Sequence, residues 1–190
     1  MAGLLLAAGS GSRLGRPKAL VKLGGQSLAE RGVVLLRDGG ADPILVVTGA
    51  AEVALPGVTT VPNPDWRTGM GSSLRAGLAA LPAESAAVVI ALVDQPLIGA
   101  EAVQRLIAAF QANAEVVVAG YAGKRRNPVL ISRPHWARVA ALAEGDSGAR
   151  EFLRSRPDLI TLIECGDIGR ADDLDTAEDL ERITDLMQPG

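Results

Sequence analysis

Short apolar runs alternate with amphipathic segments along most of the chain. The apolar runs are rich in Val, Ile and Leu, and they lie at residues 3–6, 44–48, 87–93, 115–119, 129–132 and 159–164. Several of them are apolar at successive positions, which is typical of strands that are buried on both faces of a sheet. We therefore interpret these runs as the strands of a mostly parallel sheet.

The segments between these runs carry helical patterns. A capping box formed by Ser27 and Glu30 opens one helix, and a capping box formed by Thr176 and Asp179 opens another near the end of the chain. Within residues 99–113 the apolar side chains recur at the spacing of one helical face. This alternation of strands and helices predicts an α/β domain with helices on both faces of the sheet.

Length and fold class together indicate where a ligand should bind. The chain has 190 residues, which suits one domain spanning residues 1–190. In mostly parallel sheets, ligands bind beyond the carboxyl ends of the strands. The turns that follow Leu6 and Val93 are therefore the first places to look for a site.

Composition argues against several kinds of partner. The longest apolar run, residues 86–93, has eight residues, whereas a helix that crosses a bilayer needs about 18 to 20. Aromatic residues make up 3% of the chain, too few to stack on the bases of a nucleic acid. The single cysteine, Cys165, cannot form an internal disulfide, which suits a reducing compartment. We expect a cytoplasmic protein that binds neither membranes nor nucleic acids.

The formal charge of the chain is unevenly distributed. Its net value is only -3. Residues 1–25 nevertheless carry four cationic side chains and no acid, namely Arg13, Arg16, Lys18 and Lys22. This asymmetry indicates a local anion site near the start of the chain.

The stretch Leu4–Leu20, LLLAAGSGSRLGRPKAL, joins an apolar strand to glycines and cations. A dinucleotide-binding loop, G-x-G-x-x-G, does not fit, because the third glycine comes one residue late and the second strand ends at Thr48 without an acid. A phosphate loop does not fit either, because the Gly-Lys pair at 123–124 is followed by arginine. We expect the glycines to bring backbone amides to a triphosphate, while Arg13 and Lys18 meet its charge.

A carboxylate stands at the end of another buried strand. Asp94 directly follows the run 87–93, and Pro96 ends the strand because proline cannot continue a sheet ladder. Magnesium is commonly held by one or two carboxylates together with phosphate oxygens. Asp94 is therefore a candidate ligand for Mg²⁺ at the edge of the sheet where the triphosphate should lie.

The opening loop, LLAAGSGSRLGRPKAL, resembles the L-A-A-G-x-G-x-R-x-G-x-x-K signature of nucleotidyltransferases. Four further motifs follow in order: NPDWRTGMGSSLRAGL, LVDQPLI, GDSGAREFL and DLDTAEDL. Together they resemble the molybdenum cofactor cytidylyltransferases, which belong to the MobA-like NTP transferases, and the resemblance covers essentially the whole chain. It implies a Rossmann-like three-layer αβα sandwich, as in nucleotide-diphospho-sugar transferases. It also implies Mg²⁺-dependent transfer of CMP from CTP to the terminal phosphate of molybdopterin, with release of pyrophosphate.

The resemblance also implies roles for individual residues. The catalytic residues would be Arg13, Lys18 and Asp94, and the metal ligands Asp94 and Asp175. The nucleotide would contact Leu6, Ala7, Ala8, Gly9, Gly11, Gly69, Gly71 and Ser73. The acceptor would contact Gly145, Asp146, Gly148 and Arg150.

Asp173 is an alternative to Asp175 as the second carboxylate near the metal. Acids before a helix also stabilise its positive end, so a metal ligand and a helix-stabilising acid both stay open as explanations. His135 and Cys165 lack a surrounding site signature, and we expect both to be structural.

The sequence leaves several alternatives open for the nucleotide, the acceptor and the activity. Leu14 stands where the family usually has Phe or Met, at a position tied to the choice between CTP and GTP. Asn127 stands where a histidine is expected before proline, near the acceptor. Transfer to another small phosphorylated acceptor would use the same opening loop. A noncatalytic carrier that delivers the cofactor to a recipient molybdoenzyme would bind NTP and metal without turnover.

Overall fold

The computed structural model describes residues 1–187, and the loose tail that we expect at 188–190 lies outside these residues. A seven-stranded sheet forms the middle of the molecule, with strand order β5-β4-β1-β6-β8-β7-β9. In chain order these strands are β1 (Ala2–Leu6), β4 (Ile44–Thr48), β5 (Thr59–Pro62), β6 (Ala87–Leu92), β7 (Val116–Tyr121), β8 (Lys124–Ser132) and β9 (Ile160–Glu164). Strands β2 (Lys22–Leu23) and β3 (Gln26–Ser27) form a separate small hairpin.

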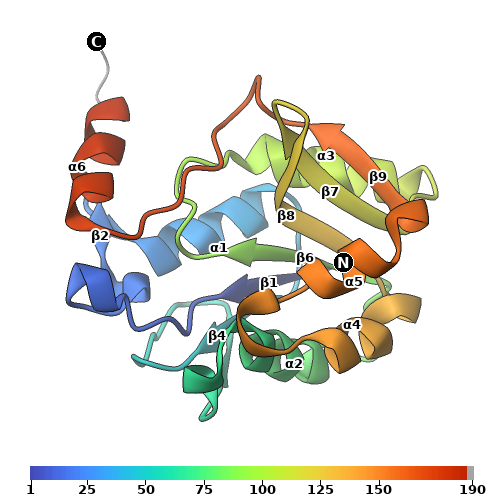
Figure 1. Cartoon of the computed structure of the whole chain (residues 1–190), viewed down its shortest axis with the longest axis horizontal. Coiled ribbons are helices and arrows are strands. Elements are labelled where there is room, and N and C mark those ends of the chain that lie inside the picture. The colour runs from blue at the N-terminus through green and yellow to red at the C-terminus, as the bar shows by residue number, and fades with distance from the viewer. Residues whose placement is uncertain (188–190) are drawn as a thin grey trace.

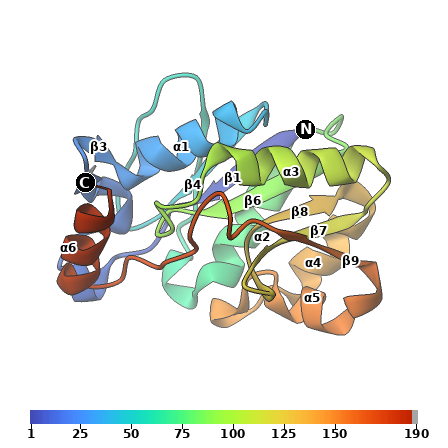
Figure 2. The ribbon, with the colours of Figure 1, turned by 90° about the horizontal axis from the view of Figure 1, so that it is seen from above.

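Helices cover both faces of the sheet (Figure 1). The described helices are α1 (Leu28–Asp38), α2 (Met70–Ala80), α3 (Ala100–Gln111), α4 (Trp136–Leu142), α5 (Arg150–Ser155) and α6 (Ala177–Leu186). Figure 2 shows α1 and α3 on one face and α2, α4 and α5 on the other, with α6 beyond the end of the sheet. This arrangement confirms the α/β three-layer sandwich with a mostly parallel sheet. In residues 1–187, no helix combines the length and the apolar character that crossing a membrane requires.

Strand β1 lies at the centre of the parallel part of the sheet. Leu4 pairs in parallel register with Leu45 of β4 on one side and with Ile90 of β6 on the other. Successive side chains of a strand point to opposite faces, so Leu5 joins the core beneath α1 and α3, while Leu4 joins the core beneath α2 and α4. The alternation explains why β1 is apolar at every position.

Strand β8 departs from the parallel pattern. It pairs antiparallel with both β6 and β7, and it extends well beyond the run 129–132 that the sequence indicates. Its first half is exposed and carries Lys124, Arg125 and Arg126. Charged residues on a solvated half-strand interrupt an apolar pattern, which is why this part escapes detection from the sequence.

Other differences concern short or exposed elements. The edge strand β5 is mostly exposed, and the β2–β3 hairpin has only two residues in each strand. Helices α4 and α5 have seven and six residues, too few to show a clear helical period. The helices expected after Ser27, after Gly99 and after Thr176 are all present, and both capping boxes form as predicted.

Candidate active site

A cleft of about 280 Å³ lies beyond the carboxyl ends of β1 and β6. The turns that follow these strands contribute Ala8, Gly9, Ser10, Lys18 and Asp94 to its lining. The opposite wall comes from the segment before and within the first turn of α2, with Trp66, Arg67, Gly69, Met70 and Ser73. We call this space the nucleotide cleft. It lies where ligands bind in parallel α/β sheets, as the sequence predicts.

The backbone of the glycine loop folds back on itself after β1. Gly11 has a φ of +59°, and a side chain at this position would collide with the carbonyl oxygen of Arg16. Only glycine fits such a close approach with a left-handed backbone. The short turn that follows, Ser12–Leu14, reverses the chain and returns Lys18 to the cleft. Gly9 borders the cleft, and a side chain there would meet no atom within 4 Å.

Lys18 joins two distant parts of the chain. Its Nζ donates hydrogen bonds to Asp94 Oδ2 at 2.7 Å and to Asp175 Oδ1 at 2.5 Å, and its side chain is only 15% exposed. Burial lowers the pKa of Lys18, but the two carboxylates outweigh burial and leave this pKa above its ordinary value. Lys18 therefore remains a cation at neutral pH.

Asp94 occupies the position that the sequence predicts, just beyond β6. Burial raises the pKa of Asp94, and the positive charge of Lys18 opposes this effect. Its Oδ2 accepts from Lys18, whereas its Oδ1 is buried and has no hydrogen-bond partner in the described structure. A buried carboxylate oxygen without a partner is costly, unless a ligand or a metal completes it. Asp94 thus fits a site for a divalent cation.

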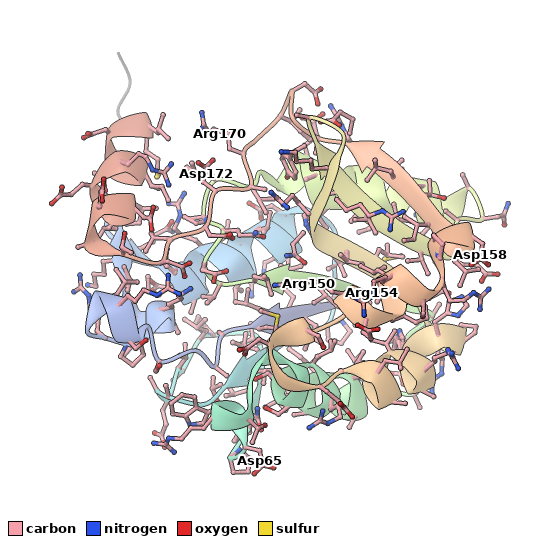
Figure 3. The ribbon with its side chains drawn as sticks, viewed as in Figure 1. Asp65, Arg150, Arg154, Asp158, Arg170 and Asp172 are labelled. Atoms are coloured by element: carbon pink, nitrogen blue, oxygen red, sulfur yellow. The ribbon has the colours of Figure 1, made fainter. Side chains whose placement is uncertain are left out.

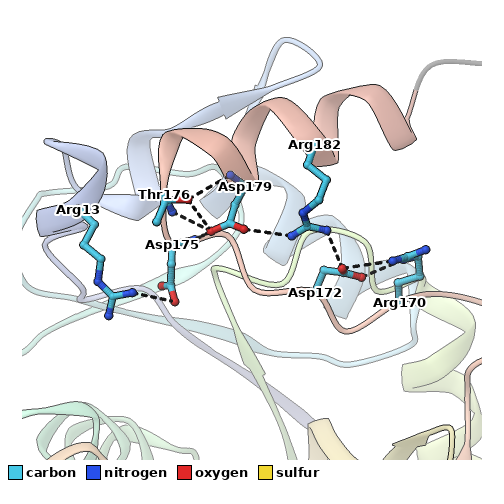
Figure 4. A network of polar contacts seen from close by, with 7 residues as sticks. All are labelled: Arg13, Arg170, Asp172, Asp175, Thr176, Asp179 and Arg182. Atoms are coloured by element: carbon cyan, nitrogen blue, oxygen red, sulfur yellow. Dashed lines mark hydrogen bonds and ion pairs between the residues drawn. The ribbon is translucent and has the colours of Figure 1, made fainter.

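Asp175 lies just before α6, and its carboxylate turns away from the helix (Figure 4). The helix is capped by other groups: Thr176 Oγ1 accepts from the backbone N–H of Asp179, and Asp179 accepts from the backbone N–H of Thr176. Asp175 instead contacts Lys18 and lies 3.7 Å from Arg13 Nη1. The helix-cap explanation therefore applies to Thr176 and Asp179, and the Asp175 carboxylate remains directed at the site.

The neighbouring Asp173 has a different environment. Its Oδ1 accepts a hydrogen bond of 2.8 Å from Gln95 Nε2, whereas the backbone N–H of Leu174 donates to the carbonyl oxygen of Asp94. These two contacts bind the segment before α6 to the end of β6. They hold Asp175 in reach of Lys18, although the two parts of the chain are far apart in sequence.

The wall formed by residues 69–73 is supported by contacts with residues 143–148. Gly69 has a φ of +110°, and a side chain there would collide with the backbone of Gly145. Asp146 Oδ1 accepts from the backbone N–H of Met70 at 3.4 Å. Gly71 packs against the backbone of Ala143 and Glu144, and Gly148 packs against Met70. The motifs at 69–73 and 145–148 therefore form one structural unit.

Asn63 is a supporting residue that sequence reasoning missed. It is buried just after β5, and its Nδ2 donates hydrogen bonds to Ser72 Oγ at 2.9 Å and to Ser73 Oγ at 3.0 Å. Its own Oδ1 accepts from the backbone N–H of Asp65. Asn63 thus fixes the first turn of α2 against the end of an edge strand. Its place at the start of the NPDWRTGMGSSLRAGL motif was the available signal.

The predicted nucleotide contacts do not all border the nucleotide cleft. Its lining includes Leu6, Ala8, Gly9, Gly69 and Ser73, whereas Ala7 and Gly71 are buried and do not contribute to this lining. Gly11 and Arg13 border an adjoining hollow of about 160 Å³, which also contacts Lys18 and Asp175. The Arg13 side chain is 71% exposed there. The cationic loop therefore continues past the cleft toward α6.

The predicted acceptor residues separate into two places. Asp146 borders the nucleotide cleft, whereas Arg150 borders a second cleft of about 540 Å³ on the other side of Leu92. We call this second space the arginine cleft. Its lining consists of Leu92, Gln95, Val118, Arg125, Arg126, Asn127, Val129, Arg150, Leu153, Arg154 and Asp173.

Two residues that we expect to be structural lie outside both clefts. His135 Nε2 lies 2.7 Å from Glu115 Oε2, and its ring packs against Phe152. Cys165 is fully buried directly after β9, and burial raises the pKa of its thiol. Neither residue contributes to the lining of the nucleotide cleft or of the arginine cleft.

Comparison with known proteins identifies the family. Residues 3–159 match the MobA-like NTP transferase domain. The chain is 37% identical to nicotine blue oxidoreductase from Paenarthrobacter nicotinovorans, with 95% of each protein covered. It is 36% identical to molybdenum cofactor guanylyltransferase from Rhodobacter capsulatus, over 60% of this chain and 62% of that protein. Rv0371c from Mycobacterium tuberculosis H37Rv, solved in complex with manganese, is similar with a TM-score of 0.79, 26% identity and 97% coverage of both chains.

These similarities agree with the site that the structure forms. The family match covers the glycine loop, Asp94 and both clefts apart from Asp173, and the similarity to the solved structure extends over nearly the whole chain. They confirm the resemblance to MobA-like proteins drawn from the sequence motifs. The chain belongs to the MobA-like NTP transferase domain family and is a nucleotidyltransferase.

Proposed function

We propose that this protein transfers CMP from CTP to the terminal phosphate of molybdopterin or the molybdenum cofactor and releases pyrophosphate. The observation that carries the proposal is Lys18, which lies between Asp94 and Asp175 beneath a glycine loop at the carboxyl edge of the sheet. Such an arrangement brings a cation and two candidate metal ligands to the place where a triphosphate can approach backbone amides.

The chemical step needs no general base. An oxygen of the acceptor phosphate, already an anion at neutral pH, attacks the α-phosphorus of CTP. A new P–O bond forms, and the bond between the α-phosphorus and the oxygen that bridges it to the β-phosphate breaks. The electron pair leaves with pyrophosphate. Catalysis then consists of holding the two reactants in line and balancing the negative charge that they bring together.

The residues of the nucleotide cleft suit these tasks. The backbone of Ala8 and Gly9 would lie against the nucleotide, and Ser73 would contact its base or ribose from the opposite wall. Lys18 would supply positive charge to the triphosphate from inside the cleft. Arg13 would do so from the exposed side, next to Asp175.

A divalent cation fits the carboxylates of this site. Asp94 offers a buried oxygen that has no hydrogen-bond partner among residues 1–187, and Asp175 contacts the same lysine amino group. Oxygen ligands of this kind, completed by phosphate oxygens and water, suit Mg²⁺. We propose that Asp94 and Asp175 hold Mg²⁺, which would neutralise charge on the triphosphate. The similar Rv0371c structure contains manganese, which supports a divalent metal of this class.

CTP is our preferred donor, and GTP is the alternative. The sequence Leu6–Gly9 resembles the cytidylyl form of the loop. The relative from Rhodobacter capsulatus is named a guanylyltransferase, so the base must be tested directly. A molybdoenzyme that receives the product is a further partner that we propose.

The relative named nicotine blue oxidoreductase motivates a second reaction class, because its similarity extends over 95% of both chains. The structure offers less support for it. The glycine spacing departs from the dinucleotide-binding pattern, and no acid ends β4 at Thr48. Consumption of NADH or NADPH with nicotine blue would support this alternative.

The test of the proposed function is a pyrophosphate-release assay on the purified protein. The reactions contain Mg²⁺, metal-free or molybdenum-loaded molybdopterin, and one of CTP, GTP, ATP or UTP, with Asp94→Asn as the control. We expect release with CTP that is lost in the variant. Release with GTP alone would overturn the choice of base. Absence of release with every nucleotide would contradict the transfer to this acceptor.

A further inference from the structure

The arginine cleft has an unbalanced positive charge. Four arginines contribute to its lining, with Asp173 as the acid among the described lining residues. Arg154 is already paired with Glu151 at 2.7 Å. In the described part of the chain, no carboxylate lies within 4.0 Å of Arg125, Arg126 or Arg150. These three guanidinium groups are therefore available to a ligand.

The acid in this cleft does not neutralise the arginines. Asp173 accepts a hydrogen bond from Gln95 at 2.8 Å and forms no ion pair in residues 1–187. Like charges gathered in one cleft repel one another, and an anion that binds between them relieves this repulsion. The planar guanidinium group also matches the geometry of phosphates and carboxylates.

The arginines come from two separate elements. Arg125 and Arg126 lie on the exposed first half of β8, and Arg150 opens α5. Figure 3 shows Arg150 and Arg154 together on the side of α5 that lies near the middle of the molecule. A single cleft collects these side chains because β8 pairs between β6 and β7, next to α5.

The arginine cleft is next to the site of transfer but distinct from it. Leu92, the last residue of β6, borders both clefts. Asp94 borders the nucleotide cleft, while the adjacent Gln95 borders the arginine cleft. A molecule in the arginine cleft can thus extend toward Lys18 and Asp94, but Arg125 and Arg150 do not border the nucleotide cleft, where the attacking phosphate must arrive.

We propose that the arginine cleft binds a second anionic group of the acceptor, separate from the phosphate that attacks the nucleotide. The acceptor class is then a molecule with negative charges at two separated positions. Arg125 and Arg150 are the principal residues that select it, and Asp146 belongs to the nucleotide side. This inference rests on the proposed function, because it assigns the cleft to the acceptor of the transfer reaction.

The test compares two probes that differ by one phosphate. Fructose 1,6-bisphosphate and fructose 6-phosphate are titrated calorimetrically into protein whose nucleotide cleft is filled with Mg²⁺ and a CTP analogue with a methylene group between the α- and β-phosphates. We expect the bisphosphate to bind at least about tenfold more tightly, since one charge-assisted hydrogen bond is worth about that factor. The double variant Arg125→Gln, Arg150→Gln should remove this advantage.

The double variant Arg37→Gln, Arg138→Gln is the matched control, because both arginines are exposed, on α1 and α4, and neither borders the arginine cleft. It changes the charge by the same amount as the double variant in the cleft and should retain the advantage of the bisphosphate. Equal binding of the two probes, including failure of both to bind, would overturn the proposal. So would an advantage that survives in the double variant.

The pyrophosphate-release assay separates this inference from the proposed function. If the bisphosphate advantage depends on the arginines but no nucleotide is transferred to molybdopterin, the named reaction is wrong and the anion site stands. If transfer occurs, Arg125→Gln should raise the KM of the acceptor about tenfold, with little change in kcat or in the KM of CTP. An unchanged acceptor KM would count against the inference.

Discussion

The nucleotide cleft and the arginine cleft lie side by side but balance their charges differently. In the nucleotide cleft, Lys18 is held by Asp94 and Asp175. In the arginine cleft, Arg125 and Arg150 have no carboxylate partner in the described structure. A site that takes a triphosphate together with a metal needs groups of both signs, whereas a site for a bare anion needs only cations. The comparison shows that two neighbouring clefts can differ in charge balance, and this difference is the basis of the division that we propose between the nucleotide and the second anionic group of the acceptor.

Asp94→Asn should produce the largest effect, and on the nucleotide side only. The change removes a negative charge at the proposed metal site while keeping the shape of the side chain. We expect kcat to fall about a hundred- to thousandfold, the usual cost of losing one group that stabilises a transition state. Binding of the bisphosphate probe in the arginine cleft should be unchanged. Steady-state pyrophosphate release measures the loss.

Asp38→Asn is the control for that experiment, because Asp38 is exposed at the end of α1 and borders neither cleft. If kcat of Asp94→Asn stayed within about threefold of the wild type, the loss would be far smaller than expected. That result would contradict the assignment of Asp94. A loss of both catalysis and probe binding would contradict the separation of the two clefts.

Lys18→Ala should have the next largest effect. It removes the cation that we place at the triphosphate and leaves Asp94 without its hydrogen-bond donor. We expect kcat/KM for CTP to fall about a hundredfold, with bisphosphate binding preserved. Lys22→Ala is the matched control, since Lys22 is an exposed lysine of the same segment. If Lys22→Ala lowered kcat/KM as much as Lys18→Ala, a general electrostatic effect would explain both.

Asn63→Ala tests the wall of the nucleotide cleft. The change removes the donor to Ser72 and Ser73 in a buried setting. We expect the free energy of unfolding to fall by about 1 to 3 kcal/mol and the KM for CTP to rise, with probe binding in the arginine cleft preserved. Urea unfolding measures the first quantity, and Gln111→Ala on the exposed end of α3 is the control. An unchanged KM would show that this wall does not position the nucleotide.

Asn63 shows which site residues cannot be predicted from local sequence patterns. The positions of Asp94 and of the glycine loop can be predicted from the sequence, because each follows a run of buried apolar residues. The residues directly after such a run lie at the end of a strand. The hydrogen bonds of Asn63 depend on how β5 and α2 pack together, which no local pattern contains. The association of Asp146 with Met70 instead of with Arg150 likewise depends on long-range packing.

The same limit applies to the arginine cleft and to Asp175. Arg125 and Arg126 interrupt the apolar pattern of β8, so no local pattern shows that they meet Arg150. Only the family resemblance, which implies that Asn127 and Arg150 both lie near the acceptor, points to it. Asp175 could cap a helix or face a metal, and only the hydrogen bonds of Thr176 and Asp179 separate these explanations. Local motifs therefore predict the elements and the main site residues, whereas tertiary packing decides which of them meet.

Asp179→Asn should give the smallest effect, and its size should depend on pH. Hydrogen bonds from the Thr176 side chain, from Arg182 and from the backbone lower the pKa of Asp179 to about 2 from 3.8. Since the pKa is lower in the folded state, the carboxylate stabilises the fold above pH 3.8, and this contribution is lost as the pH falls toward about 2. Asparagine can still accept a capping hydrogen bond but carries no charge, so the variant should be less stable than the wild type at pH 7, and this difference should shrink in acid.

The measurement is the free energy of unfolding of wild type and Asp179→Asn as a function of pH. The two curves should converge as the pH falls from 3.8 toward 2, because only the wild type loses a charged cap in that window. Asp185→Asn, on the exposed surface of the same helix, should follow the wild type. Parallel curves for wild type and Asp179→Asn would show that the charge of Asp179 does not hold α6, and with it Asp175, against the nucleotide cleft.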